Sequence, residues 1–253
     1  MEKFEFDKST GTITKYIGTD VDVIVPSEID GIPVTAIGLR AFSECRSVKN
    51  ITIPNGITTI GDKAFEGCEK LKSINIPDSV VTIGESAFGW CKSMKSIIIP
   101  DSVTTIGDFA FICCISLESI IIPDSVTSIG LFAFAVCESM KSIVIPNSIT
   151  TISAGTFCHC KSLKHVTIPD SVTRIGEEAF ICCTSLESII IPDIVTAIGG
   201  AAFAVCESLE SVSLPDSVKI GPIAFLECPV KKSIDNIIKK NQKRSFKNGK
   251  TRI

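Results

Sequence analysis

The sequence predicts a solenoid, in which the chain winds through turns of equal length and stacks each turn on the one before it. The first observation is a recurring proline, which appears every 23 residues at Pro54, Pro77, Pro100, Pro123, Pro146, Pro169, Pro192 and Pro215. The second is that cysteine keeps the same interval from Cys45 to Cys206, and phenylalanine keeps it from Phe42 to Phe203. A fixed period of 20–29 residues is typical of leucine-rich-repeat solenoids, whose turns bury their apolar side chains against neighbouring turns.

The repeated unit is represented by residues 107–129, GDFAFICCISLESIIIPDSVTSI. The apolar positions Leu117, Ile120 and Ile122 finish with an alternation of inward and outward side chains. This alternation predicts a short strand whose Ile121 faces solvent. The proline that follows cannot donate to a sheet ladder and ends the strand, and Pro-Asp-Ser predicts a turn. The V-x-x-I-G segment then brings the chain back on the opposite side, and Ala-Phe is long enough for only one helical or 3₁₀ turn. We therefore expect Phe and Cys to point inward between the two sides.

The two ends of the chain depart from this repeat, which predicts three regions. Residues 1–20 contain two strand-like runs separated by Gly11, and we expect a β-hairpin cap over the open sheet edge of the first repeat. Residues 21–230 hold about nine repeats, which makes a solenoid roughly 43 Å long at the usual strand spacing. Residues 231–253 contain nine Lys or Arg and one acid, and we expect a basic cap made of a partial strand and a short helix.

Two features indicate how the repeats arose and where they are irregular. The segment from Phe111 to Asp124 recurs from Phe180 to Asp193 with one difference, which indicates duplication of a three-turn block rather than a single catalytic centre. We use the word column for the residues at equivalent positions of successive repeats. The sixth repeat departs from the pattern, because Ser153 replaces the glycine of one column and Thr156 replaces the alanine of another.

The pattern I-G-x-x-A-F-x-x-C-x-S-L-x-S-I-x-I-P-x-S-V runs from about Pro26 to Cys228 and resembles the BspA-like (Treponema pallidum-type) leucine-rich-repeat family. The resemblance implies a right-handed superhelix with a parallel β-sheet on its concave face and short strands or 3₁₀ turns on its convex side. It also implies a binding role, often at a microbial cell surface, without specifying the partner.

Composition and charge argue against several classes of function. Outside residues 231–253 the chain has 16 bases against 27 acids, so its body is acidic and only its tail is basic. We expect that tail to be a solvated cap, and we expect no nucleic-acid binding. No stretch approaches the ~18 apolar residues of a membrane span. Residues 1–7, MEKFEFD, lack the apolar region of a signal peptide, which favours the cytoplasm, whereas the resemblance favours the cell surface or secretion.

Twelve cysteines raise the question of disulfide bonds. Nine of them, from Cys45 to Cys228, occupy one column that we expect to be buried, where a free cysteine behaves as a small hydrophobe. Because an odd number of cysteines in one column cannot all pair within it, we expect reduced, structural thiols.

The two histidines, His159 and His165, mark the candidate for metal or thiol chemistry. Stacking is expected to bring Cys158, His159 and Cys182 toward one another across adjacent turns. A zinc site needs about four ligands, and a Cys–His nucleophile needs an oriented base and an oxyanion site, which this trio does not supply. We expect no enzyme activity and no cofactor, and we keep the trio as a distant alternative.

The outward column of the predicted strands is the main candidate for a binding site. Ile98, Ile121 and Val144 occupy it in consecutive turns, and Ile190 follows two turns later, although a solvated sheet face is expected to be polar there. A charged column runs beside them and includes Lys72, Lys95, Glu118 and Lys141. An apolar centre with a charged border is typical of an interaction surface, so we expect a protein ligand on the concave face. Ordinary β-propensity is the competing explanation.

Two other columns leave alternatives open. Apolar residues on the flank form either extra core or a self-association surface: Trp90, Phe109, Ile112, Cys113, Leu131, Phe132, Ala135, Val136, Ile181, Cys182, Ala204 and Val205. The aspartates after the prolines line one rim, where they either attract cations or a basic partner or, as we favour, cap their own turns together with the adjacent serines. They are Asp78, Asp101, Asp124, Asp170, Asp193 and Asp216.

Overall fold

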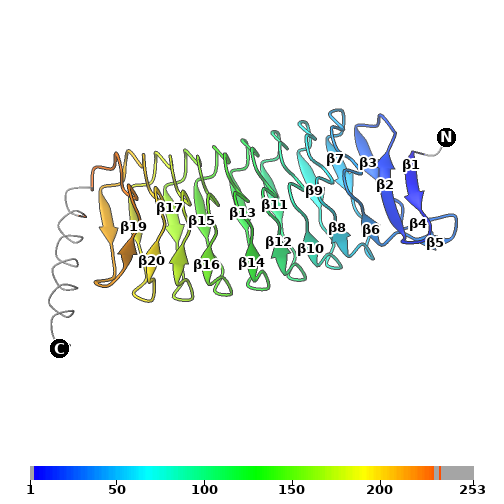
Figure 1. Ribbon diagram of the computed structural model, residues 1–253. Coiled ribbons are helices and arrows are strands. Elements are labelled where there is room, and N and C mark those ends of the chain that lie inside the picture. The colour runs from blue at the N-terminus through cyan, green and yellow to red at the C-terminus, as the bar shows by residue number, and fades with distance from the viewer. Residues whose placement is uncertain (1–2, 231–233, 235–253) are drawn as a thin grey trace.

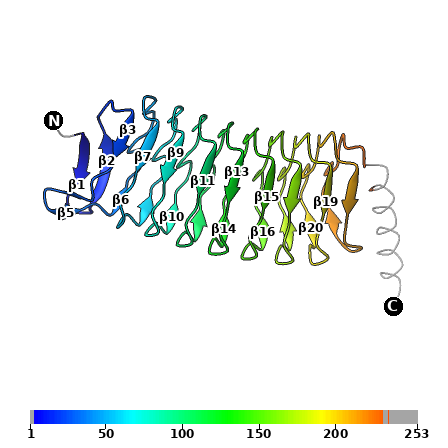
Figure 2. The ribbon, with the colours of Figure 1, turned by 180° about the vertical axis from the view of Figure 1, so that it is seen from behind.

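Each turn of the chain contributes two short strands, and strands of successive turns lie side by side along an elongated body (Figure 1 and Figure 2). The computed structural model describes residues 3–230 and Ile234. The long-strand file contains the three-residue strands β3 (Asp22–Ile24), β7 (Asn50–Thr52), β9 (Ser73–Asn75), β11 (Ser96–Ile98), β13 (Ser119–Ile121), β15 (Ser142–Val144), β17 (His165–Thr167), β19 (Ser188–Ile190) and β21 (Ser211–Ser213). The short-strand file contains the two-residue strands β6 (Ala36–Ile37), β8 (Thr59–Ile60), β10 (Thr82–Ile83), β12 (Thr105–Ile106), β14 (Ser128–Ile129), β16 (Thr151–Ile152), β18 (Arg174–Ile175), β20 (Ala197–Ile198) and β22 (Lys219–Ile220).

Within both files the strand pairs are parallel, and equivalent residues of successive turns face each other. Ile97 of β11 lies opposite Ile120 of β13, and Ile83 of β10 lies opposite Ile106 of β12. The predicted solenoid of parallel strands is therefore confirmed. Its register follows from the repeat, since any slip would turn the buried isoleucine of a strand toward solvent.

The N-terminal strands β1 (Phe4–Asp7) and β2 (Thr12–Tyr16) pair antiparallel, as the predicted hairpin requires. β2 also pairs in parallel with β6, so the hairpin extends the short-strand file rather than covering the first long strand, β3. The segment between β3 and β6 contains a second antiparallel pair, β4 (Glu28–Ile29) with β5 (Ile32–Pro33). The predicted C-terminal partial strand and helix lie outside the described residues, apart from Ile234, which is buried.

A stack of aromatic rings forms the centre of the solenoid. The ring centroids of successive phenylalanines lie 5.1 to 5.6 Å apart, and the rings are nearly parallel. Tyr16 of the hairpin extends the stack at its N-terminal end, 5.1 Å from Phe42. The stacked residues are Phe42, Phe65, Phe88, Phe111, Phe134, Phe157, Phe180, Phe203 and Phe225, and every one of them is buried.

The cysteine column ties each turn to the preceding one. The Cys68 thiol donates a hydrogen bond to the Phe42 carbonyl at 3.1 Å. The same bond recurs in each later turn as far as Cys228, at 2.9 to 3.3 Å between Sγ and the carbonyl oxygen. Burial raises the pKa of the Cys68 and Cys114 thiols to about 12, which keeps them protonated and able to donate. Cys45, which we expected to be buried, is half-exposed because it lies in the first loop of the series.

The column glycine allows successive turns of the short-strand file to approach closely. A Cβ on Gly107 would lie 2.7 Å from backbone atoms of Gly84 and Glu85, which is closer than real Cβ contacts. The Gly107 amide donates to the Ile83 carbonyl at 2.9 Å, and equivalent bonds join most successive turns. A residue with a side chain at this position must therefore hold two turns apart.

Ser153 is such a residue, and it interrupts the short-strand file. Its hydroxyl donates to the Ile129 carbonyl at 2.6 Å, in the place that the glycine amide takes in other turns. β14 and β16 do not pair, and among the described residues the file divides into a seven-stranded and a four-stranded sheet. Thr156, in the alanine column, is buried and donates through its hydroxyl to the Ser153 carbonyl at 2.8 Å.

Substitution of a column glycine tests this account of turn spacing. We expect Gly107→Ala to lower the free energy of unfolding by about 1–3 kcal/mol, because its Cβ would overlap the backbone of the preceding turn. Gly200→Ala is the control, because its Cβ would meet only Pro222 at 3.5 Å, an ordinary contact. Urea denaturation followed by circular dichroism measures both variants. Equal stability of Gly107→Ala and the parent chain would contradict close approach as the role of this column.

Thiol alkylation tests the cysteine column. In the native protein we expect a thiolate-specific reagent at pH 8 to modify the half-exposed Cys45 and Cys182 first, since burial raises the pKa of Cys68 and Cys114 to about 12. Unfolding should make all twelve cysteines reactive. Mass spectrometry of digested protein assigns each modified residue. Several disulfides in protein purified without reductant would overturn the expectation of reduced thiols.

Candidate functional site

The outward surface of the long-strand file, here called the long-strand face, carries large apolar side chains in water. Ile98 and Ile121 are each 76% exposed, Ile190 is 73% exposed and Val144 is 64% exposed. β11 and β13 pair so that Ile98 lies opposite Ile121, and β15 and β17 place Val144 opposite Thr167. Alternation along each strand thus directs these side chains outward, as the sequence predicted.

Ile24 belongs to the same outward column, although the sequence analysis did not single it out. It ends β3 opposite Thr52 of β7 and is 76% exposed. The sequence contains a signal for this residue, because the run from Val21 to Val25 has the pattern of a strand and is followed by a proline of the repeat.

A column of small polar residues lies beside the apolar column on the long-strand face. It is exposed and mostly serine: Asn50, Ser73, Ser96, Ser119, Ser142, His165, Ser188 and Ser211. At the N-terminal end, the Asn50 amide donates to Asp22 at 2.6 Å, and the Ser73 hydroxyl donates to Asn50 at 3.0 Å. These short side chains leave room for another surface to approach the sheet.

The charged column completes the long-strand face, and its charge changes along the solenoid. It reads Lys49, Lys72, Lys95, Glu118, Lys141, Lys164, Glu187 and Glu210. Ion pairs join Lys141 to Glu118 at 3.0 Å and Lys164 to Glu187 at 3.6 Å. The hydrogen bond from Lys141 is the main cause that lowers the pKa of Glu118. Three lysines at one end and two glutamates at the other therefore give the face opposite charges at its two ends.

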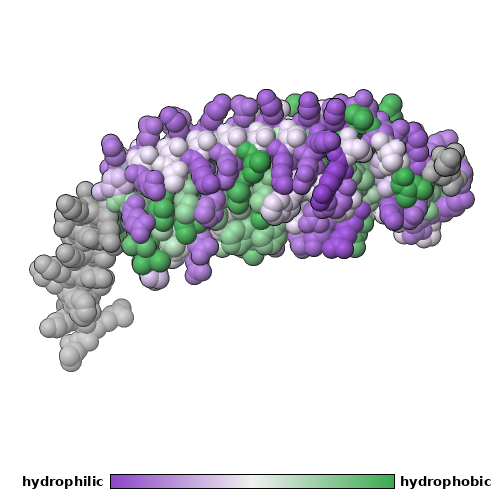
Figure 3. Space-filling view, turned by 90° about the horizontal axis from the view of Figure 1, so that it is seen from above, coloured by the Kyte–Doolittle hydropathy of each residue, from purple (hydrophilic) through white to green (hydrophobic). Residues whose placement is uncertain are grey.

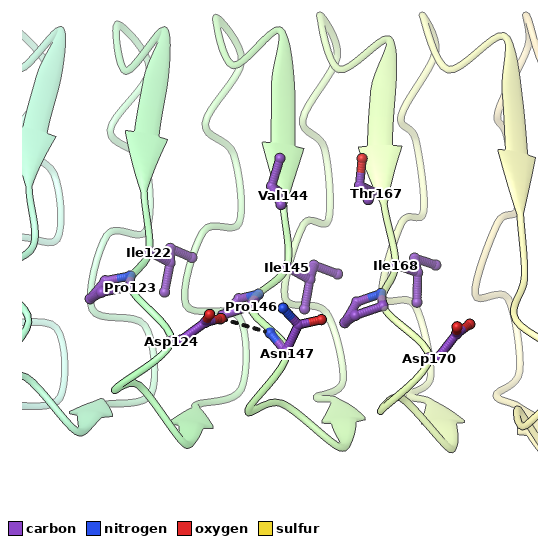
Figure 4. A pocket seen from close by; sticks show the side chains of 11 residues that line it. Ile122, Pro123, Asp124, Val144, Ile145, Pro146, Asn147, Thr167, Ile168 and Asp170 are labelled. Atoms are coloured by element: carbon purple, nitrogen blue, oxygen red, sulfur yellow. Dashed lines mark hydrogen bonds between the residues drawn. The ribbon is translucent and has the colours of Figure 1, made fainter.

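An open depression of about 590 Å³ continues the face at the carboxyl ends of the strands. Val144 and Thr167 lie at its upper margin, above rows of isoleucine, proline and Asp or Asn side chains from three turns (Figure 4). The backbone N–H of Asn147 donates to the Asp124 carboxylate at 2.9 Å. The serines of this rim do not cap their own turns as expected. Ser102 instead donates to the Val80 carbonyl of the preceding turn at 2.6 Å, a bond that recurs in several turns.

The flank is partly buried and lies outside the continuous core. Cys113, Ala135 and Ala204 are buried there, whereas Trp90 and Leu131 remain 46% and 43% exposed. The rings of Phe109 and Phe132 stack at 5.5 Å, and Phe132 covers Gly155, where any Cβ would overlap its ring. Viewed from above, the rod carries hydrophilic side chains along one long edge, and its hydrophobic side chains form separate patches elsewhere (Figure 3).

The structure gives no support to a metal or thiol site at Cys158, His159 and Cys182. Within residues 3–230, no three His, Cys, Asp or Glu side chains come together in a way that could hold a metal ion. Burial raises the pKa of Cys158 to about 11, so its thiol is protonated and weakly nucleophilic near pH 7. His165 is exposed on β17, within the small polar column. No helix in the described part of the chain has the length and hydropathy to cross a membrane.

Comparison with known proteins bears on the fold and on the family. The family described as BspA-type leucine-rich repeat region matches residues 27–140 and 127–251 in six copies. The crystal structure of the Treponema pallidum leucine-rich-repeat protein has 32% identity and a TM-score of 0.68, over 72% of this chain and 86% of that one. A leucine-rich cell surface protein from Faecalibacterium prausnitzii has 25% identity and a TM-score of 0.41, over 89% and 90% of the two chains. A leucine-rich-repeat protein from Bacteroides ovatus has 24% identity and a TM-score of 0.43, over 90% and 91%.

No curated protein matches the chain. The matched residues contain the column proline, phenylalanine, cysteine and glycine whose stacking is described above. The 23-residue period, the parallel strands of successive turns and the family match over residues 27–251 agree, and the chain belongs to the BspA-type leucine-rich-repeat family.

Proposed function

We propose that this chain is a non-enzymatic protein-interaction module, which binds a protein ligand through the long-strand face. The observation that supports this most directly is the run of exposed apolar side chains at Ile98, Ile121 and Val144, in three adjacent turns. Burying each such side chain against a partner is worth about 1.5–3 kcal/mol before the costs of association. Leaving all three in water brings no stabilisation to the solenoid, because none of them packs in its core.

The surroundings of the apolar run also suit a protein interface. Small hydroxyl side chains lie on one side of it, and the charged column of lysines and glutamates lies beyond them. An apolar centre with a polar rim is the usual arrangement of protein–protein interfaces. Adhesion at a cell surface and scaffolding of other proteins are the two roles that we propose for such a module.

The second candidate is a structural or self-associating solenoid that uses the apolar flank. Trp90 and Leu131 support it, because both are large and half-exposed. Every other flank residue is buried or partly buried, so none is as exposed as Ile98 or Ile121. The Lys92 ammonium lies 5.5 Å from the centre of the Trp90 ring, where it partly occupies that surface. The long-strand face therefore offers the larger apolar surface to a partner.

A double substitution on the long-strand face tests the proposal. We expect Ile98→Ser with Ile121→Ser to weaken retention of a protein ligand at least tenfold in a pull-down with the intact chain, read by mass spectrometry. Thermal stability should barely change, because both side chains are 76% exposed. Ile194→Ser is the matched control, since Ile194 is half-exposed at a turn position where most other turns have serine.

Two outcomes of this experiment would contradict the proposal. A marked fall in melting temperature of the double variant would show that these isoleucines contribute to the core. Unchanged retention with unchanged stability would show that the ligand binds the flank or the tail.

A further inference from the structure

The charged column has a symmetry that becomes apparent once the turns are stacked. Over the seven turns from β9 to β21 it reads Lys72, Lys95, Glu118, Lys141, Lys164, Glu187 and Glu210. Reading the same column backward from Glu210 gives the opposite charge at every position except the central one, Lys141. The column is thus complementary to its own reverse.

The outward apolar column is symmetric about the same turn. Over those seven turns it reads Asn75, Ile98, Ile121, Val144, Thr167, Ile190 and Ser213. Its two ends are polar, the isoleucines next to the ends match each other, and Val144 lies at the centre. Of the six residues flanking Val144, Ile121 and Thr167 are the pair that differs in polarity, and both are β-branched.

A simple rotation brings these symmetric columns together. A two-fold axis parallel to β15 and lying just above it turns one long-strand face onto that of a second molecule. The rotation keeps the strand direction and reverses the order of the turns, so each column meets its own reverse. Such a contact is isologous and closes as a dimer, because both molecules use the same surface.

We propose that the partner of the long-strand face is a second copy of this chain, bound face to face with its turns in reverse order. This inference rests on the proposed function and names its protein ligand. In the dimer, Lys72 lies opposite Glu210, Lys95 opposite Glu187, and Glu118 opposite Lys164, and each pair occurs twice. Ile98 lies opposite Ile190, also twice, and the two Val144 side chains meet at the axis.

The centre of this arrangement tolerates its one pair of like charges. Each Lys141 is already paired with Glu118 of its own chain at 3.0 Å, and its side chain is 69% exposed. The neighbouring Ser142 is small and uncharged, so two sheets can approach to the usual spacing of about 10 Å.

Other registers fit less well. With the axis midway between β13 and β15, Lys72 lies opposite Glu187 and Glu118 opposite Lys141, but the like-charged Lys95 and Lys164 lie opposite each other twice. The polar Asn75 then lies opposite Ile190. Moving the axis to β13 leaves Lys72 opposite Lys164, Lys95 opposite Lys141 and Glu118 opposite itself. Like charges directly opposite each other are repelled, and of these three registers the axis at β15 has the fewest such contacts, one at Lys141.

Charge reversal tests both the dimer and its register. One variant carries Lys72→Glu and Lys95→Glu, and the other carries Glu187→Lys and Glu210→Lys; all four side chains are exposed. Sedimentation equilibrium should show the parent chain as a dimer and should show the dissociation constant of each variant alone raised at least tenfold. An equimolar mixture of the two should form a heterodimer, because every reversed charge then meets an opposite one. Placing all four changes in one chain should restore the homodimer.

Lys49→Glu is the register control. Lys49 belongs to the same column as Lys72, one turn earlier. It would lie opposite Glu210 if the axis were between β13 and β15, but with the axis at β15 Glu210 lies opposite Lys72 instead. Its dimer dissociation constant should stay close to that of the parent chain. Circular dichroism of every variant confirms that folding is retained.

Three results would overturn the inference. The parent chain would remain a 27.1 kDa monomer at its highest soluble concentration, the two charge-reversed variants would fail to associate when mixed, or each variant alone would dimerise as tightly as the parent. If the parent is monomeric while Ile98→Ser with Ile121→Ser still loses a retained protein, the long-strand face binds a different protein and the proposed function stands without the dimer.

Discussion

The close stacking of equivalent side chains in successive turns is the interaction on which the rest of the structure depends. Each phenylalanine ring lies 5.1 to 5.6 Å from the next. From Cys68 to Cys228, each thiol of the cysteine column donates to the carbonyl of the phenylalanine in the preceding turn. No single turn can bury its own apolar residues, so the free energy of folding comes largely from contacts between neighbours. The strand register, the exposure of the outward columns and their alignment all follow from this stacking.

Much of the fold could be predicted from sequence, because residues at equivalent positions of successive repeats lie next to each other once the turns are stacked. Alternation within Leu117-x-x-Ile120-x-Ile122 was enough to assign the buried and exposed residues of every long strand, and the exposure of Ile98 and Ile121 agrees with it. The hairpin at an open sheet edge of the first repeat was also predicted, but the strand that it pairs with was not. Pairing of β2 with β6 depends on contacts between non-equivalent residues, which no period describes.

The candidate site was only partly predictable for a related reason. The exposed isoleucines could be found one turn at a time, whereas the opposite charges at the two ends of the face emerge only when seven turns are read as one surface. Predictions of hydrogen bonds within one turn also failed where the acceptor lies in another turn. The rim serines were expected to bond within their own turns, yet Ser102 reaches the Val80 carbonyl 22 residues earlier in the chain. Cys45 likewise looks like every other column cysteine in sequence, and only its place at the start of the series exposes it.

Replacement of one glycine by Ser153 has a consequence for how the rod unfolds. In a linear array, cooperativity passes from one turn to the next through their shared interface, so the weakest interface sets the boundary between units that melt separately. The junction between β14 and β16 lacks a strand ladder, although the Phe134–Phe157 stack continues through it at 5.6 Å. The short-strand file is thus divided into blocks that end at Ile129 and begin at Thr151. A chain built from nearly identical turns thereby acquires one junction at which we expect the array to open most readily.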